Sequence, residues 1–275
     1  RSVTTTRYQY DGRGIVDPAH RHVFVIPAEG GIARQLTEGD FNHFGKLAWT
    51  PDSTEIFFSA DRSEDWELSS NEADIYAVAL ANGRIRPVTD FPGAERNPVM
   101  APNGKTLAFS YEQRRPLAFT PNQIALLDLQ TQGMTILTDN LDGDANNILW
   151  AEDSKSLYFS FDERGMRHIR KITRRKVVTT VAEDVGGTTI GRPYLSGGFH
   201  RANGVTAFTQ GRQHRPSDVA IVKNKRLEVV TALNDDLLDY RALGKVTEVT
   251  YQSSFDGQEI QGWYVTPPDF DPTKK

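Results

Sequence analysis

The chain has 275 residues, of which 38% are hydrophobic and 25% are charged, and its formal net charge is -4. This composition is typical of a globular protein and gives no general attraction to nucleic acid or anionic lipid, so we expect neither as a partner. Because cysteine is absent, disulfides, thiolate metal sites and a cysteine nucleophile are excluded.

The N-terminal residues give no sign of a targeting segment. Arg1 to Thr6 contain neither an apolar signal core nor a starting methionine. No stretch reaches the roughly 18 apolar residues of a membrane span. We therefore expect a soluble protein, cytoplasmic or periplasmic, whose chain begins inside a longer polypeptide.

Two short hairpins are predicted at the start of the chain. Tyr8 to Tyr10 alternate like a strand and precede a turn at Asp11 to Gly14. Val23 to Ile26 are apolar, and Gly30 with Gly31 separates them from a second strand ending at Thr37. These residues predict a partial blade over Tyr8 to Thr37.

One hairpin pattern then occurs three times. It reads LAWTPDSTEIFFSA from Leu47, VMAPNGKTLAFSY from Val99 and LWAEDSKSLYFSF from Leu149. Trp49 to Met100 is 51 residues and Met100 to Trp150 is 50. A constant period of this size indicates a repeat architecture.

A second hairpin pattern alternates with the first. Its turns contain Gly31, Gly83 and Gly133, which are 52 and 50 residues apart. Glycine, asparagine and aspartate are favoured there because tight hairpin turns require positive φ. Each unit thus has a hairpin, a loop of 10 to 20 residues, another hairpin and a link of about a dozen residues. Four antiparallel strands per repeat of about 50 residues describe an all-β fold, the β-propeller.

We predict four full blades after the partial one, at Gly45 to Thr89, Asn97 to Thr138, Asn147 to Val181 and Gly191 to Thr231. The later units are less regular. Arg174 to Lys176 form a turn without glycine, and GGFHRANG, between Tyr194 and Thr209, is interpreted as an insertion.

A β-sandwich or unrelated hairpins are the alternatives. A sandwich has no reason to repeat the same turn residues and the same threonine-terminated strand. The signatures of kelch and WD repeats are not present.

The repeated hairpin resembles the TolB-like propeller repeat, usually written as a W-S-P-D-G core followed by an apolar strand. The preceding text, YQYDGRGIVDPAHRHVFVIPAEGGIARQLTEGD, resembles acylaminoacyl-peptidase-like members of the prolyl oligopeptidase family of serine peptidases. A dipeptidyl-peptidase-like relative is the other form that this resemblance allows.

The C-terminal text favours the peptidase over a stand-alone TolB-like propeller. EVTYQSSFDGQEIQGWYVTPPDFDPTKK, from Glu248 to Lys275, resembles the stretch that leads from the propeller of those peptidases into an α/β-hydrolase domain. Val249 to Ser254 and Glu259 to Val265 are strand-like, Asp256-Gly257 supplies a turn, and Pro267-Pro268 ends pairing.

The resemblance implies a propeller at residues 1–240 and, at 241–275, a linker with the first hairpin of a catalytic domain that this chain does not contain. It implies a propeller that admits short peptides to an active site elsewhere, with the hydrolase domain and peptide substrates as partners. No G-x-S-x-G is present, and Ser196, Ser253 and Ser254 lack that context. We therefore expect no catalytic residue, no cofactor and no metal here, and association between chains through open propeller edges.

Two groups resemble metal sites weakly. His20 and His22 could bind a metal, but no third ligand accompanies them at a recognised spacing, so a solvated loop is favoured. Asp142, Asp144 and Asn146 match the start of a calcium loop. Asn147 replaces the expected glycine and Asp153 the expected glutamate, which favours an ordinary inter-blade loop.

The remaining polar groups are predicted to be surface features. They are the carboxylate pairs Glu64-Asp65 and Asp235-Asp236 and the basic clusters Arg114-Arg115-Pro116 and Arg174-Arg175-Lys176. Trp49, Met100 and Trp150 occupy equivalent positions, which predicts packing between blades.

Overall fold

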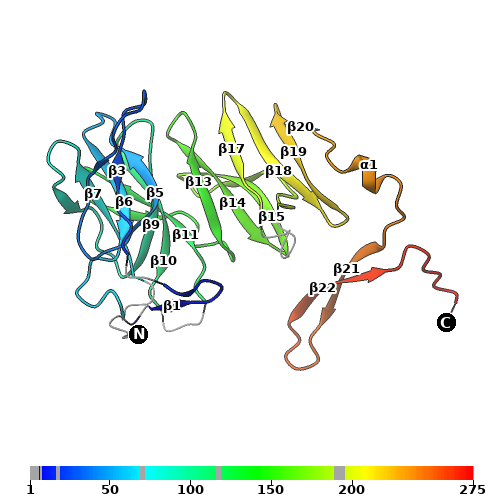
Figure 1. Cartoon of the computed structure of the whole chain (residues 1–275). Helices are drawn as coiled ribbons and strands as arrows, with labels where there is room; N and C mark the ends of the chain where they lie inside the picture. Colours follow the sequence, from blue (N-terminus) through cyan, green and yellow to red (C-terminus); the bar gives the residue numbers. More distant parts are fainter. Residues whose placement is uncertain are drawn as a thin grey trace. The chain divides into compact units, whose positions relative to one another are not determined.

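The computed structural model describes residues 6, 8–16, 19–68, 72–115, 119–188 and 196–274. The chain forms two compact units, Arg1–Tyr158 with Ile172–Val177, and Phe159–Lys171 with Val178–Lys275. Strands dominate both units, and each larger sheet has its strands side by side in sequence order (Figure 1).

Four four-stranded sheets confirm the predicted propeller blades. Blade 1 contains β5 (His43–Trp49), β6 (Glu55–Ala60), β7 (Asp74–Ala79) and β8 (Ile85–Pro87), and blade 2 contains β9 (Gly93–Met100), β10 (Thr106–Gln113), β11 (Gln123–Asp128) and β12 (Met134–Ile136). Blade 3 contains β13 (Ala145–Trp150), β14 (Ser156–Glu163), β15 (Met166–Thr173) and β16 (Val178–Ala182), and blade 4 contains β17 (Phe199–Ala202), β18 (Val205–Arg212), β19 (Arg215–Lys223) and β20 (Arg226–Val229).

The repeated turn residues adopt the backbone conformation that the sequence predicts. Ser53, Gly104 and Ser154 follow the first strand of blades 1, 2 and 3, and their φ angles are 57°, 67° and 57°. Gly104 also lies against blade 1, since a Cβ there would come within 2.4 Å of Pro51 Cγ. The turns of blades 1 and 2 are therefore in direct contact.

A threonine follows the second hairpin of the partial blade and of blades 1, 2 and 4, and in each case it bonds the strand that begins that hairpin. The hydroxyls of Thr37, Thr89, Thr138 and Thr231 accept hydrogen bonds from Val23 N, Ile75 N, Ile124 N and Val219 N, each at 2.8 Å. Three of these four N–H groups are buried and need an acceptor, which explains why threonine recurs there.

Apolar side chains are packed between neighbouring sheets. Phe57, Leu107 and Phe109 belong to the core shared by blades 1 and 2, and Phe58 belongs to a core that includes Val23. Phe57, Phe58 and Phe109 are at most 1% exposed, so truncation of any one to alanine should cost about 3–5 kcal/mol. A separate core in the second unit contains Ile169, Phe208 and Ala220.

The partial blade consists of two small hairpins. β1 (Gln9–Tyr10) pairs with β2 (Gly14–Ile15), and β3 (Phe24–Val25) pairs with β4 (Arg34–Gln35). Their strands are shorter than predicted. Val23 and Leu36 pack against blade 1, which places the second hairpin on the face of that blade.

Two predictions about the later blades are wrong. β14 and β15 are joined by only Arg164-Gly165, and β18 and β19 by Gln213-His214, instead of loops of 10 to 20 residues. GGFHRANG is no insertion, because it contains β17 and the tight turn Asn203-Gly204. The links between blades are also uneven. The link from β8 to β9 contains only residues 88–92, fewer than the dozen predicted. Gly191 and Tyr194 lie outside the described residues.

A hairpin outside the blades follows a short helix, α1 (Asp235–Leu238). β21 (Lys245–Gln252) and β22 (Glu259–Thr266) pair over their whole length, which confirms the predicted hairpin, and pairing ends before Pro267. The turn is wider than predicted, although Gly257 does have a positive φ of 73°. No helix in the described part of the chain is long and apolar enough to cross a membrane.

The three equivalent positions in the repeated hairpin differ in their packing. Trp150 Nε1 donates to Val99 O of the preceding blade at 2.9 Å, and Met100 packs against the core of blades 1 and 2. Trp49 is 46% exposed. The predicted packing between blades is thus confirmed for two of the three residues.

Candidate functional site

Blades 1 and 2 have two different ends. Tight turns such as Asp52-Ser53 lie at one end, and the longer connections, such as the one that begins at Asp61 after β6, start at the other. His43 begins β5 and Asp74 begins β7 at the long-connection end, while Glu95 lies near the start of β9. Buried ionisable side chains gather there, which is typical of functional sites.

The imidazole of His43 is neutral and lies between two hydrogen-bond partners. Its Nδ1 is 2.8 Å from Arg21 O, and its Nε2 is 2.8 Å from Arg62 Nη1. A guanidinium can only donate, so Nε2 accepts and Nδ1 carries the proton. Burial of this side chain, which is 5% exposed, lowers the pKa of His43 to about 4.

The guanidinium of Arg62 is fixed by aromatic rings as well as by His43. It lies 4.5 Å from the ring centroid of Phe41 and 5.9 Å from that of Tyr76. These contacts order the start of the connection from β6 to β7. Burial raises the pKa of Tyr76 to about 12, and the neighbouring Asp74 carboxylate contributes to the shift.

Glu95 is the most deeply buried carboxyl group of the site. Its side chain is 0% exposed, and among the described residues no hydrogen bond of regular geometry reaches either carboxyl oxygen. Burial and the neighbouring Asp74 raise the pKa of Glu95 to about 8, and burial also raises the pKa of Asp74. At neutral pH Glu95 is protonated, because an unpaired buried carboxylate is expensive.

The one hydroxyl that meets a carboxylate among these residues is that of Tyr76, which donates to Asp74 Oδ2 at 3.5 Å, and the raised pKa of Tyr76 makes it a poor nucleophile. Among the described residues, no group of three or more histidine and acidic side chains could hold a metal ion. His43, Arg62 and Tyr76 present fixed polar groups. Their chemistry suits the positioning of another molecule better than bond cleavage.

The histidines singled out in the sequence lie beside this site. His22 and His43 have ring centroids 5.3 Å apart, and His20 packs edge-on against Trp66 at 5.7 Å. His20 and His22 are partly buried and lie outside any strand. His22 thus lies against His43, a residue that the sequence did not single out.

The calcium-like residues form an ordinary link between blades 2 and 3. Asp144 Oδ1 accepts a hydrogen bond from Asn122 N at 2.8 Å, which ties the link to β11. Asn146 lies within β13, and Asn147 has a φ of 53°. Asp142 lies in the link itself.

The charged pairs and clusters lie on the surface. Glu64 and Asp65 are exposed, and Asp235 forms an ion pair with Arg215. Asp236 belongs to the first turn of α1. In the basic clusters, Arg114 pairs with Glu72, Arg115 donates to Gln113, Arg174 donates to Ser154 O, and Lys176 pairs with Asp139. Arg175 is exposed, and Pro116 lies outside the described residues.

The serines support turns. Ser196 Oγ accepts a hydrogen bond from Thr188 N at 2.9 Å, and Ser253 Oγ accepts one from Phe255 N at 3.2 Å. Ser254 is exposed in the turn between β21 and β22.

The site residues that sequence reasoning missed are His43, Arg62, Asp74 and Glu95. The sequence could have indicated them only by position, because each lies near the beginning or end of a repeat strand. Polar residues at strand entrances are candidates for a buried cluster. Their separation in the sequence, from 43 to 95, hid the grouping.

Four-stranded antiparallel sheets repeated along the chain define a β-propeller protein. Residues 9–116 match the family model of the dipeptidyl peptidase IV (DPP IV) N-terminal region. Dipeptidyl-peptidase 5 of Porphyromonas gingivalis is 25% identical in an alignment 273 residues long, which covers 92% of this chain and 38% of that protein. The uncharacterized peptidase YuxL of Bacillus subtilis is 22% identical and covers 94% of this chain and 40% of that protein.

The chain therefore spans about two fifths of the length of the curated relatives it matches. Among solved structures, a Bacteroides ovatus protein provisionally described as a dipeptidyl aminopeptidase IV has a TM-score of 0.58, 12% identity, and coverage of 90% of this chain and 37% of that one. TolB from Acinetobacter baumannii has a TM-score of 0.54, 19% identity, and coverage of 78% and 50%. At these identities the structures support the fold, and the chain is similar to the propeller portion of dipeptidyl-peptidase-like peptidases.

Proposed function

We propose that this chain is the propeller portion of a serine peptidase of the prolyl oligopeptidase family that acts on short peptides. The observation that carries the proposal is the match of residues 9–116 to the DPP IV N-terminal region, extended over 92% of the chain by dipeptidyl-peptidase 5. In such an enzyme the propeller would admit short dipeptidyl or acyl-peptide substrates and exclude folded proteins.

The hairpin of β21 and β22 supports this proposal. It lies outside the four blades and ends at Pro267-Pro268. We propose that residues 241–275 link the propeller to an α/β-hydrolase domain that supplies serine, histidine and aspartate for acyl transfer. The long-connection end, with Arg62 fixed by His43, would then help to position a peptide.

The test uses the complete protein from the source genome beside the 275-residue chain. The complete protein should hydrolyse dipeptidyl p-nitroanilides or acyl-peptides, and a serine-directed inhibitor should abolish this activity. It should also cleave a free peptide but spare the same sequence within a folded protein. The chain alone should be inactive. Inhibitor-sensitive hydrolysis by the chain alone, or a complete protein without G-x-S-x-G, would contradict the proposal.

A second candidate is a non-enzymatic TolB-like propeller that binds other proteins. The structural likeness to TolB from Acinetobacter baumannii favours it. The same complete protein separates the two candidates, because an interaction propeller would be followed by neither an oxyanion segment nor a nucleophilic serine.

A further inference from the structure

A groove of about 330 Å³ lies between the tight-turn ends of blades 1 and 2, away from the cluster around His43. Phe57, Val88, Met100 and Leu129 line it with apolar atoms, and they belong to the core that joins the two blades. Its volume is in the range of small-ligand pockets.

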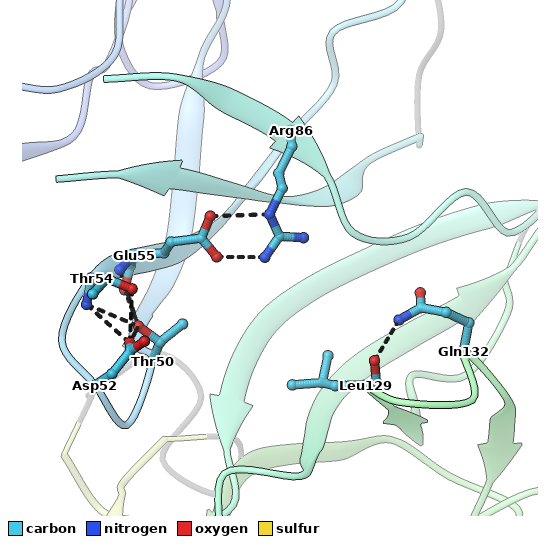
Figure 2. A network of polar contacts seen from close by, with 7 residues as sticks. All are labelled: Thr50, Asp52, Thr54, Glu55, Arg86, Leu129 and Gln132. Atoms are coloured by element: carbon cyan, nitrogen blue, oxygen red, sulfur yellow. Dashed lines mark hydrogen bonds and ion pairs between the residues drawn. The ribbon is translucent and has the colours of Figure 1, made fainter. Parts of the chain in front are cut away.

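Glu55 and Asp52 both lie beside the groove, and among the described residues only Glu55 has a cationic partner (Figure 2). Arg86 Nε and Nη2 donate to the two carboxylate oxygens of Glu55 at 3.0 and 2.5 Å, so these charges cancel. Asp52 Oδ1 accepts hydrogen bonds from Thr50 Oγ1 at 2.7 Å and from Thr54 N and Oγ1 at 3.1 and 2.8 Å. The Thr50 hydroxyl foremost, and then the groups of Thr54, lower the pKa of Asp52, which remains ionised.

The repeat supplies an internal comparison at the next junction. Leu129 N donates to Lys105 O in blade 2, and Arg174 N donates to Lys155 O in blade 3. Leu129 and Arg174 therefore occupy equivalent positions, one in each second hairpin. Leu129, which is short and apolar, lies at the junction of blades 1 and 2. Arg174, which is long and cationic, lies at the junction of blades 2 and 3.

Arg174 uses its length to cross the junction between blades 2 and 3. Its Nε donates to Ser154 O at 3.2 Å, its Nη2 donates to Thr106 Oγ1 at 2.9 Å, and its guanidinium lies 5.3 Å from the Trp150 ring centroid. The residues equivalent to Trp150 and Ser154 are Met100 and Gly104, which both line the groove. Arg174 thus reaches across the junction between blades 2 and 3, whereas Leu129 is too short to do so at the groove. There the guanidinium of Arg86 is held by Glu55, the residue equivalent to Thr106, and the space beside Met100 and Gly104 is left to the groove.

We propose that the groove between blades 1 and 2 binds an arginine side chain presented by a short peptide. The aliphatic stem would pack on Met100 and Leu129, and the guanidinium would lie between the Asp52 carboxylate and the backbone of the Gly104 turn. Arginine suits this site because its stem is apolar and its planar head donates to several oxygens at once.

The remaining polar atoms fit a peptide backbone. Gln132 Nε2 donates to Leu129 O at 2.9 Å, which leaves Gln132 Oε1 as an acceptor at the rim (Figure 2). Arg86 Nη1 has no partner among the described residues and can donate to a peptide carbonyl. A single-side-chain contact of this kind should bind with a Kd on the order of 1 mM.

The test titrates acetyl-Gly-Arg-Gly-amide into the ¹⁵N-labelled 275-residue chain and follows backbone amide shifts. Amides of Asp52, Gly104 and Gln132 should shift together and saturate. The matched citrulline peptide, which has the same shape without the charge, should bind roughly tenfold more weakly, the loss expected for one charge-assisted contact. Equal binding of the two peptides, or shifts confined to other regions, would overturn the proposal.

Two variants and a control sharpen the result. Leu129→Arg should fill the groove as Arg174 fills the next junction and abolish the shifts, whereas Asp52→Asn should remove the preference for arginine over citrulline. Thr135→Ala, at an exposed position in β12, should bind like the parent chain. Because Asp52 is exposed, Asp52→Asn remains informative even if Leu129→Arg does not fold. An unchanged preference in Asp52→Asn would count against the proposal.

Discussion

Gly165 and Trp263 are in contact where the turn between β14 and β15 meets the hairpin of β21 and β22. Gly165 has a φ of 70°, and a Cβ built there would lie 2.4 Å from Trp263 Cη2. Arg164 Nη2 and Glu248 Oε1 are 3.4 Å apart beside this contact, and Gln261 Nε2 donates to the same carboxylate at 2.6 Å. The C-terminal hairpin is thus anchored to a blade by a glycine that leaves room for an indole.

The first prediction is that Gly165→Ala detaches the hairpin. The new methyl group must displace Trp263, and the positive φ adds strain, so the change should destabilise the local contact by roughly 1–3 kcal/mol. Limited proteolysis should cleave between the blades and β21 faster in the variant.

Gly204→Ala is the matched control for that prediction. Gly204 has a φ of 77° in the β17–β18 turn, but a Cβ there meets nothing within 4 Å. The control therefore carries the backbone strain without the collision. Equal proteolysis of the two variants would show that the contact with Trp263 does not hold the hairpin.

The second prediction concerns acid stability. The folded-state pKa of His43 is lowered to about 4 from an ordinary value of 6.5. Because the unfolded state binds the proton first, His43 should reduce stability as the pH falls from about 6.5 to about 4, by up to about 3 kcal/mol. Urea unfolding across this range should show a smaller pH dependence for His43→Gln than for the parent chain. Parallel pH profiles would contradict the prediction.

The third prediction is a loss of stability as the pH rises, opposite to the effect of His43. The pKa of Glu95 is raised to about 8 from 4.5, so the unfolded state loses its proton first, and stability is lost as the pH rises from about 4.5 to about 8. Glu95→Gln is neutral at every pH and should stabilise the chain at pH 8 but have little effect at pH 4.5. The melting temperature at both pH values measures the effect, with the exposed Glu38→Gln as a control. Destabilisation by Glu95→Gln at pH 8 would refute the buried, protonated carboxyl group.

The fourth prediction is association between chains. The outer strand of blade 4, β20, exposes Leu227 and Val229, and Val230 follows it. Unpaired strand edges with apolar side chains favour pairing between molecules. Light scattering should give a mass that rises with concentration, and Val229→Lys should reduce this rise because charged side chains protect edges. A strict monomer over a wide concentration range would exclude such association.

The repeat, the blade number and the turns were predictable because they depend on local conformation. A tight turn at Ser53, Gly104 or Ser154 needs only a residue that accepts positive φ, and alternation of apolar residues marks the strands around it. The middle connections of blades 3 and 4 were mispredicted for the same reason. Arg164-Gly165 and Gln213-His214 are weak turn signals when no knowledge of the paired strands accompanies them.

The candidate site depended on contacts between distant residues. His43 and Glu95 carry no motif, and their pKa values shift only when the packing of β5, β7 and β9 removes the two side chains from water. The groove likewise needs two blades, since Asp52 and Gln132 come from different repeats. Local sequence patterns therefore specified the strands and turns, whereas the pairing of distant strands decided which polar side chains are buried, which ones meet and which space remains open.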